Sequence, residues 1–221
     1  MACNIFINHF SLYSLYKSKN LNLVLDNVDN IYIDGAMLVK QINWLFGTNI
    51  KRYSFDWSSI AEKTIKYYSF EGKVLFWGGE KQHTDNFISY LSDKNLSKNV
   101  TCTDGFTLRL NDISELINKY NYSAVIIGRG TPQQETDLLY LSKEHPNVDF
   151  FTCGGFITQV GLFGDIYGEQ YSRLPRWLCR IMRQPFVLKR VLYTYPISFI
   201  QVFKLRKVLN DHIHKFKEFK L

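Results

Sequence analysis

An aspartate at the exit of a short apolar run is the first candidate for chemistry in this sequence. Tyr32 and Ile33 lead into Asp34, and Gly35 follows it. A carboxylate at the end of a buried strand lies at the rim of a pocket, where partial burial suits it to act as a general base. An aspartate before a glycine is also typical of a turn or a helix cap. Asp34 is therefore a candidate catalytic base, and this segment alone leaves both interpretations open.

A glycine-rich turn between an apolar run and a helical pattern is the second candidate. It reads Gly128-Arg129-Gly130-Thr131-Pro132-Gln133-Gln134-Glu135. Glycines let the backbone approach a ligand closely, and Pro132 is expected at the first position of a helix whose free N–H groups face the pocket. Gln134 and Glu135 would then lie in the first turn, able to bond sugar hydroxyls. The turn fits neither GxGxxG nor GxxxxGK[ST], so by itself it does not name the ligand.

Arginines form the third candidate, because they are concentrated in a short stretch that also holds Trp177. Guanidinium groups bind phosphates through paired hydrogen bonds, so the stretch is a candidate phosphate-binding site. A solvated basic helix face is the alternative, although it explains this concentration less well. The basic residues are Arg173, Arg176, Arg180, Arg183, Lys189 and Arg190.

Short apolar runs must position these candidates. Their β-branched and aromatic residues predict buried strands, and helical patterns lie between them. The sequence therefore predicts an α/β fold, a Rossmann-like and mostly parallel sheet with helices on both faces. Ligands of such sheets bind beyond the carboxyl ends of the strands, where Asp34 and the glycine-rich turn fall. The expected strands cover about residues 4–8, 31–33, 74–77, 100–102, 124–127 and 148–151.

Capping residues predict where some helices begin. Thr84 is expected to cap a helix that carries Phe87 and Leu91. Asp112 and Glu115 have the spacing of a capping box, which predicts a helix that starts after Asp112.

Charge divides the chain into two predicted parts. Residues 1–172 carry a net charge of −3 and residues 173–221 carry +10. We therefore predict a Rossmann-like core over 1–172 and a basic helical appendage over 173–221. Aromatic residues beside lysines in this appendage are typical of an anchor on an anionic lipid surface. Nucleic acid also attracts basic tails, but we rank it below the membrane and expect no nucleic-acid partner.

The expected cellular location follows from targeting and membrane-spanning patterns that the sequence does not show. The longest apolar stretch, residues 191–203, is interrupted by Pro196 and is shorter than the ~18 residues of a membrane span. The first residues do not show the basic and apolar pattern of a secretory signal. The four cysteines are far apart and have no histidine at ligand spacing, which favours reduced thiols without a metal. We expect a cytoplasmic protein, peripheral at the inner face of the cell membrane.

Taken in order, the motifs resemble those of the WecG/TagA/CpsF family of glycosyltransferases. That family's pattern runs DG, GxPxQE, GGxF…G, RxP and WxxRL…P…R. The resemblance covers about residues 4–192, and GxPxQE is its most specific part. The matching segments are Asp34-Gly35, Gly130 to Glu135, Gly154-Gly155-Phe156 with Gly161, Arg173-Leu174-Pro175, Trp177 to Arg180, and Pro185 with Arg190.

The resemblance implies an inverting, metal-independent transfer from a UDP-sugar to a polyprenyl-diphosphate-linked sugar in the synthesis of a surface polysaccharide or cell-wall polymer. The sugar moved would be N-acetylmannosamine-like, its uronate or a hexose. No cofactor is implied, and the sequence holds no DxD pair of the kind that binds a metal in other glycosyltransferases. Family members form oligomers, so the resemblance leaves a homo-oligomer open.

The resemblance also implies residue roles. Asp34 matches the proposed catalytic base, and Asn8 matches an active-site asparagine on the first strand. Gln134 matches a sugar-site glutamine. The expected substrate-binding residues are Asn8, Gly130, Pro132, Gln134, Glu135 and the tail arginines Arg173, Arg180 and Arg190, which would hold the diphosphate.

The sequence departs from the family's pattern at three positions. Phe6 stands in place of a threonine, Phe55 in place of a glycine, and Arg176 in place of a glutamate. These departures motivate an alternative, a non-catalytic nucleotide-binding partner of a membrane complex.

Overall fold

A parallel sheet is the centre of the structure. The computed structural model describes residues 2–165, 176–183, 185, 188 and 190–220. Within this part, the strand order is β2-β1-β6-β5-β3-β4, and every pair is parallel. The expected Rossmann-like α/β fold is therefore confirmed. The strands are β1 (Cys3–Ile7), β2 (Asn30–Ile33), β3 (Val74–Gly78), β4 (Val100–Thr103), β5 (Ala124–Gly128) and β6 (Asp149–Thr152).

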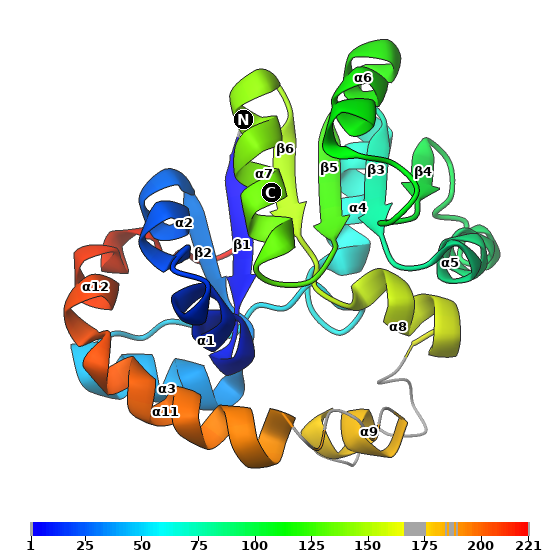
Figure 1. The fold of residues 1–221 in the computed structure, drawn as a ribbon. Helices are drawn as coiled ribbons and strands as arrows, with labels where there is room; N and C mark the ends of the chain where they lie inside the picture. Colours follow the sequence, from blue (N-terminus) through cyan, green and yellow to red (C-terminus); the bar gives the residue numbers. More distant parts are fainter. Residues whose placement is uncertain (1, 166–175, 184, 186–187, 189, 221) are drawn as a thin grey trace.

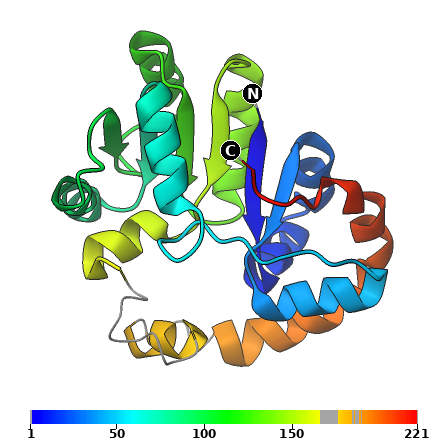
Figure 2. The ribbon, with the colours of Figure 1, turned by 180° about the vertical axis from the view of Figure 1, so that it is seen from behind.

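Helices cover both faces of the sheet, as predicted. Successive residues of β3 alternate between two apolar clusters, with Leu75 and Trp77 in one and Val74 and Phe76 in the other. Because side chains alternate across a strand, the two clusters lie on opposite faces of the sheet. The helix α7 lies in front of the sheet in Figure 1, and α4 lies in front of it in Figure 2.

The first cluster contains residues of α1 (His9–Lys17), α2 (Leu21–Asn27), α3 (Ala36–Phe46), α6 (Leu110–Tyr120) and α7 (Gln133–Glu144). The second contains residues of α4 (Ala61–Glu71), α5 (Lys81–Asp93) and α8 (Phe156–Phe163). The chain then forms α9 (Arg176–Arg183), a π-helix η2 (Arg190–Thr194), α11 (Tyr195–Lys204), α12 (Arg206–Asp211) and a short 3₁₀ turn η3 (Ile213–Lys215).

Three predicted helix starts were wrong by a few residues. Helix α5 begins at Lys81, so Thr84 lies inside it, and its hydroxyl donates to the Lys81 carbonyl. Helix α6 begins at Leu110, and Asp112 is its third residue, accepting a hydrogen bond from the Arg109 N–H at 2.7 Å. A carboxylate can cap a helix by reaching back from inside the first turn, which sequence spacing does not distinguish from an N-cap. Pro132 is the cap of α7 rather than its first residue.

The C-terminal segment packs on the core next to β2. Val202, Leu205 and Leu209 belong to the first apolar cluster. Phe216 forms a β-bridge with Ile31 at the edge of the sheet. Figure 1 shows α11 and α12 running beside α3 and around this edge. The predicted boundary between residues 172 and 173 lies outside the described residues.

Candidate active site

Asn8 and Asp34 lie next to each other at the carboxyl ends of two paired strands. Ile7 of β1 is in register with Ile33 of β2, and the Asp34 N–H donates to the Ile7 carbonyl at 2.8 Å. A Cβ atom at Gly35 would lie 3.6 Å from the Asn8 Cβ, so the two segments are in close contact. The strand arrowheads point to the lower edge in Figure 1, where α1, α3 and α11 lie. The structure thus brings together two of the predicted site residues.

Asn8 is also the N-cap of α1. Its Oδ1 accepts a hydrogen bond from the Ser11 N–H at 3.0 Å, and the Ser11 hydroxyl accepts one from the Asn8 N–H at 2.7 Å. This reciprocal cap holds the Asn8 side chain in one orientation. Because Oδ1 serves the cap, the Nδ2 amide is the part of Asn8 that can donate to a ligand.

Arg52 pairs with Asp34, and sequence reasoning gave it no role. The Arg52 Nη2 lies 2.8 Å from Asp34 Oδ1 and 3.4 Å from Asp56 Oδ2. Burial works to lower the pKa of Arg52, but the two carboxylates outweigh it, and the pKa is raised. The Asp34 side chain is 23% exposed, so it is accessible from the edge of the sheet. Arg52 reaches it because Tyr53 N–H bonds to the Ile33 carbonyl, a long-range pairing with no local sequence signal.

The glycine-rich turn follows β5, which only β6 separates from β1. Gly130 has φ of +77°, a left-handed conformation that favours glycine, and the Thr131–Pro132 bond is cis. The Ser14 hydroxyl of α1 donates to the Thr131 carbonyl at 3.2 Å. This hydrogen bond joins the turn to the helix that Asn8 caps.

Gln134 and Glu135 lie in the first turn of α7, as expected, and both side chains are buried. Gln134 is 2% exposed and Glu135 is 0% exposed. Glu135 Oε1 accepts hydrogen bonds from Gln134 Nε2 at 2.8 Å and from the Thr131 hydroxyl at 2.9 Å. Among the described residues, Gln134 Oε1 and Glu135 Oε2 are buried without a partner. Burial raises the pKa of Glu135 to about 7, against the effect of these two bonds.

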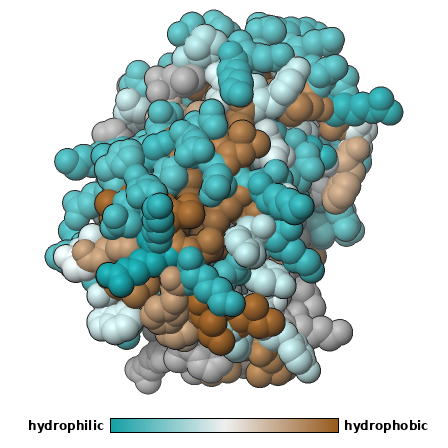
Figure 3. Space-filling model, turned by 60° about the vertical axis from the view of Figure 1, so that its left-hand side comes forward, coloured by the Kyte–Doolittle hydropathy of each residue, from teal (hydrophilic) through white to brown (hydrophobic). Residues whose placement is uncertain are grey.

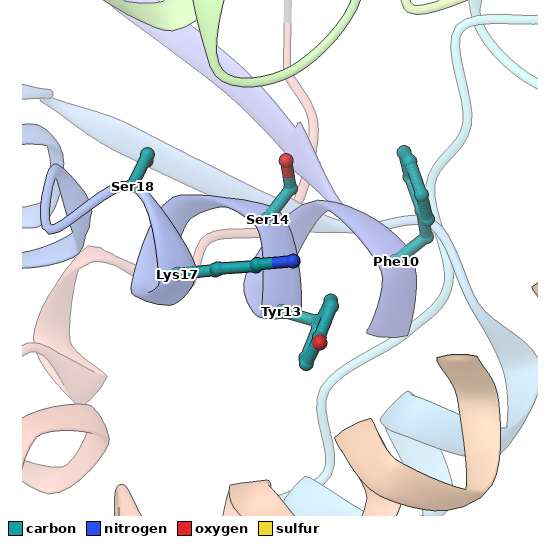
Figure 4. A pocket seen from close by; sticks show the side chains of 5 residues that line it. All are labelled: Phe10, Tyr13, Ser14, Lys17 and Ser18. Atoms are coloured by element: carbon teal, nitrogen blue, oxygen red, sulfur yellow. The ribbon is translucent and has the colours of Figure 1, made fainter. Parts of the chain in front are cut away.

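A pocket opens on α1 close to the turn. Its volume is about 320 Å³, and all of its described lining side chains come from this helix and its C-cap Ser18 (Figure 4). The lining combines aromatic rings, hydroxyls and one ammonium group, which suits a ligand with both apolar and anionic parts. These residues, which sequence reasoning did not single out, recur at helical spacing: Phe10, Tyr13, Ser14, Lys17 and Ser18.

Arg129, inside the turn, has a structural role. Its guanidinium lies over the Trp77 ring, 4.3 Å from the ring centre. It also donates to Asp137 at 2.6 Å and to the Gly105 carbonyl at 2.9 Å. Arg129 therefore ties the loops after β4 and β5 to helix α7.

The tail arginines are only partly described. Arg173 lies outside the described residues. Arg180 belongs to α9 and Arg190 is the first residue of η2, but their side chains are not described. The helix η2, which begins at Arg190, contacts α1, the helix that bears the pocket.

No group of three or more histidine, cysteine or acidic side chains suited to a metal occurs among the residues that the structure describes. In the same part of the chain, no helix is both long and apolar enough to cross a bilayer.

An exposed apolar surface lies on α3 and the segment from η2 to α11, and we call it the apolar surface. Trp44 is 74% exposed, and its ring meets the Phe203 ring edge-on. Figure 3 shows apolar side chains that extend from the middle of this side of the molecule to its lower part, with hydrophilic ones beside them. The apolar surface consists of Met37, Trp44, Leu192, Tyr193, Ile197, Ile200 and Phe203. The exposed cations Lys204, Arg206 and Lys207 follow it in the chain.

The sequence is similar to those of known proteins. The sequence matches the Glycosyl transferase WecG/TagA/CpsF family over residues 2–211, a range that includes Asn8, Asp34 and the glycine-rich turn. The chain is also 36% identical, over 193 residues, to a UDP-Gal:alpha-D-GlcNAc-diphosphoundecaprenol beta-1,4-galactosyltransferase from Shigella boydii. The match covers 83% of this chain and 79% of that relative.

Neither comparison supports the alternative of a non-catalytic nucleotide-binding partner. The protein is a glycosyltransferase, and it belongs to the WecG/TagA/CpsF family.

Proposed function

We propose that this enzyme transfers a hexose from a UDP-sugar to a hydroxyl of a polyprenyl-diphosphate-linked sugar, with inversion and without a metal ion. The name of the Shigella boydii relative supports this choice of substrates, because it contains a UDP-linked hexose and a diphosphoundecaprenol-linked sugar. The observation that carries the proposal is the Asp34–Arg52 pair, partly exposed beside Asn8 at the carboxyl edge of the sheet.

Asp34 acts as the general base. The acceptor oxygen attacks the anomeric carbon of the donor as its proton passes to the Asp34 carboxylate. The bond from that carbon to the UDP oxygen breaks, and the electron pair leaves with UDP. Arg52 favours the ionised form of Asp34 that can take this proton. A single displacement of this kind inverts the anomeric centre.

Gly130, Pro132, Gln134 and Glu135 shape the donor site in this proposal, and Asn8 binds the acceptor sugar beside Asp34. The Gly130 backbone allows close approach, and the N-terminus of α7 after Pro132 favours the anionic diphosphate. The Asn8 amide donates to a sugar hydroxyl. Gln134 and Glu135 support the turn from beneath through their bonds to each other and to Thr131.

The tail arginines neutralise the departing UDP. Arg173, Arg180 and Arg190 belong to the segment with the strongest positive charge in the sequence. Guanidinium groups stabilise a diphosphate leaving group in the way that a bound cation does in other enzymes. Transfer is therefore expected to persist in excess EDTA, and a strict requirement for a divalent metal would contradict the arginine role.

The apolar surface holds the enzyme on the membrane that carries its acceptor. Aromatic and aliphatic side chains insert at a lipid interface, and nearby cations bind anionic headgroups. Lys204, Arg206 and Lys207 supply such cations next to Phe203. In this proposal the enzyme is cytoplasmic and peripheral, and its appendage makes the membrane contact.

A transfer assay tests the function. UDP-galactose and other UDP-sugars would be offered with a synthetic polyprenyl-diphosphate sugar, and the product linkage would be determined. We expect Asp34→Asn to lower turnover by about a hundredfold or more, because general-base catalysis contributes at least that much. The asparagine oxygen can still accept the Arg52 hydrogen bond, so the fold should survive.

Asp85→Asn, which removes an exposed carboxylate on α5, is the matched control and should keep full activity. Full turnover by Asp34→Asn would remove Asp34 from the mechanism. Failure of every UDP-sugar to react with a lipid-diphosphate acceptor would refute the proposed function itself.

A further inference from the structure

Three helices meet in a buried polar junction directly behind the candidate active site. His9 is the first residue of α1 and follows Asn8 in the chain. Gln41 belongs to α3, which begins two residues after Asp34. Ser198, in α11, is the third member, and all three side chains are buried. The junction therefore joins the C-terminal segment to the two helices that continue from Asn8 and Asp34.

Each helix of the junction is bonded to the other two. His9 Nε2 lies 3.0 Å from Gln41 Oε1, and Gln41 Nε2 donates to the Phe199 carbonyl at 2.8 Å. The Ser198 hydroxyl donates to the His9 carbonyl at 2.6 Å. The rings of Tyr195 and Phe199 pack near the His9 ring, with centroid distances of 5.9 and 6.2 Å.

The bonding pattern fixes the form of His9. A backbone carbonyl can only accept, so Gln41 must direct its amide N–H toward Phe199 and its oxygen toward His9. His9 Nε2 is then the donor in that pair. Burial lowers the pKa of His9, against the effect of the Gln41 bond, so the ring is neutral near pH 7.

We propose that His9 and Gln41 are positioning residues through which α11 sets the separation of Asn8 and Asp34. The inference rests on the proposed function of these two residues. Asn8 and Gly35 are already in close contact, so a small shift of α1 against α3 changes the gap in which the acceptor hydroxyl meets its base. Positioning errors of this size lower turnover strongly without abolishing binding.

If the junction served stability alone, α11 could pack on α1 and α3 through apolar side chains, without buried hydrogen-bonding groups. Burying an imidazole, an amide and a hydroxyl costs free energy unless every group is paired, and apolar side chains would dock the helix without that cost. Directional hydrogen bonds fix orientation, which apolar contacts do much less. Among the described contacts, the Gln41 amide uses both its oxygen and its nitrogen.

The test separates positioning from stability. His9→Phe keeps an aromatic ring against Tyr195 and Phe199 but cannot donate to Gln41. Gln41→Met keeps the side-chain length and loses both bonds. We expect each variant to lower kcat by about tenfold or more while KM for the UDP-sugar changes less than about twofold. The double variant should lose no more than the worse single one, because both remove the same link.

His145→Phe is the matched control. His145 is also buried, and it lies between the end of α7 and the start of β6. Its Nε2 atom is 2.8 Å from the Ser114 hydroxyl, with which it forms a hydrogen bond. Its loss should lower the free energy of unfolding and leave kcat of the folded enzyme unchanged. Urea unfolding of every variant shows what fraction is folded in the assay.

Two outcomes would overturn the inference. An unchanged kcat for folded His9→Phe and Gln41→Met would mean that the junction serves stability alone. A loss confined to KM for the donor would place its effect on donor binding rather than on the Asn8–Asp34 gap. Transfer activity of the wild-type enzyme tests the proposed function, and the variants test only the positioning role. The two proposals can therefore fail independently.

Discussion

At the scale of single residues, the main contact of the candidate base Asp34 is its ion pair with Arg52. Arg52 lies between Asp34 and Asp56 and bonds to both carboxylates. Without this guanidinium, two carboxylates would share a partly buried site, and mutual repulsion would favour protonation of one of them. Arg52 therefore offsets the charge of both carboxylates and holds the Asp34 side chain in one direction.

Replacing Arg52 by methionine should change both the rate and its pH dependence. We expect kcat/KM near neutral pH to fall by about tenfold or more, because the Asp34 carboxylate would be less well oriented and a smaller fraction of it would be ionised. The acid limb of the pH–rate profile should move to higher pH, because the carboxylate loses the cation that favours its charged form. Lys51→Met is the control, since Lys51 pairs with Glu218 on the surface. An acid limb that stays in place would show that another group sets it.

Glu135 should make the stability of the free enzyme depend on pH. Its pKa is raised to about 7 in the folded protein from an ordinary value of 4.5, so the folded state binds the proton more tightly than the unfolded state. The stabilisation that comes from the neutral form is complete below about pH 4.5 and is lost as pH rises toward 7. By this linkage, the free energy of unfolding falls by about 3 kcal/mol across that window.

Glu135→Gln removes the titration while keeping an oxygen for Gln134 and Thr131. Urea unfolding at pH 5 and pH 8 should show the variant gaining up to about 3 kcal/mol on the wild type between the two values. The exposed Glu115→Gln should show no such gain. Equal pH dependence in wild type and Glu135→Gln would mean that Glu135 stays ionised in the folded protein.

At the scale of elements, the strands could be predicted from the sequence because most of them are buried in a parallel sheet, the edge strand β4 being the exception. A strand covered on both faces is apolar throughout, as in β5 with Val125, Ile126 and Ile127, and such a run stands out without any alignment. The glycine-rich turn and Asp34 could then be placed at the carboxyl edge, because parallel strands end on the same side.

Other contacts of the site could not be predicted from the sequence, because they depend on pairing between segments that are distant in the chain. Arg52 reaches Asp34 through a bridge to Ile33, and Ser14 reaches Thr131 across 117 positions of the chain. The burial of Gln134 follows from the packing of α7, and its position in the first turn does not reveal it. His9 carries no sequence signal of the junction that it forms.

Leu209 of α12 tests whether the C-terminal segment folds with the core. It is fully buried in the first apolar cluster, so Leu209→Ala should lower the free energy of unfolding by about 2–5 kcal/mol. We expect a single unfolding transition in urea that moves to lower concentration. Leu23→Ala, at a half-exposed position of α2, should change little. A separate early transition in the wild type would instead indicate that the appendage folds as its own unit.

At the scale of the whole molecule, the candidate active site and the apolar surface share the same helices. Helix α3 begins next to Asp34 and carries Met37 and Trp44, and α11 joins the His9 junction on one side while exposing Ile197 and Ile200 on the other. Binding of this surface to a bilayer would bring the carboxyl edge of the sheet close to the lipid headgroups. An acceptor held by its lipid could then reach Asp34 without leaving the membrane.

Vesicle binding should therefore depend on this surface and on lipid charge. We expect Trp44→Ser with Ile200→Ser to weaken binding to vesicles of mixed anionic and neutral lipid by about a hundredfold or more, since each inserted side chain contributes about 2 kcal/mol. Replacing Lys204, Arg206 and Lys207 by glutamine should weaken binding to anionic vesicles and have little effect on binding to neutral ones.

Phe70→Ser is the control for these variants, because Phe70 is 87% exposed on α4, outside the apolar surface. All variants should keep turnover on a short-chain, water-soluble acceptor, which separates membrane binding from catalysis. Unchanged vesicle binding by both sets of variants would show that this surface does not contact the membrane.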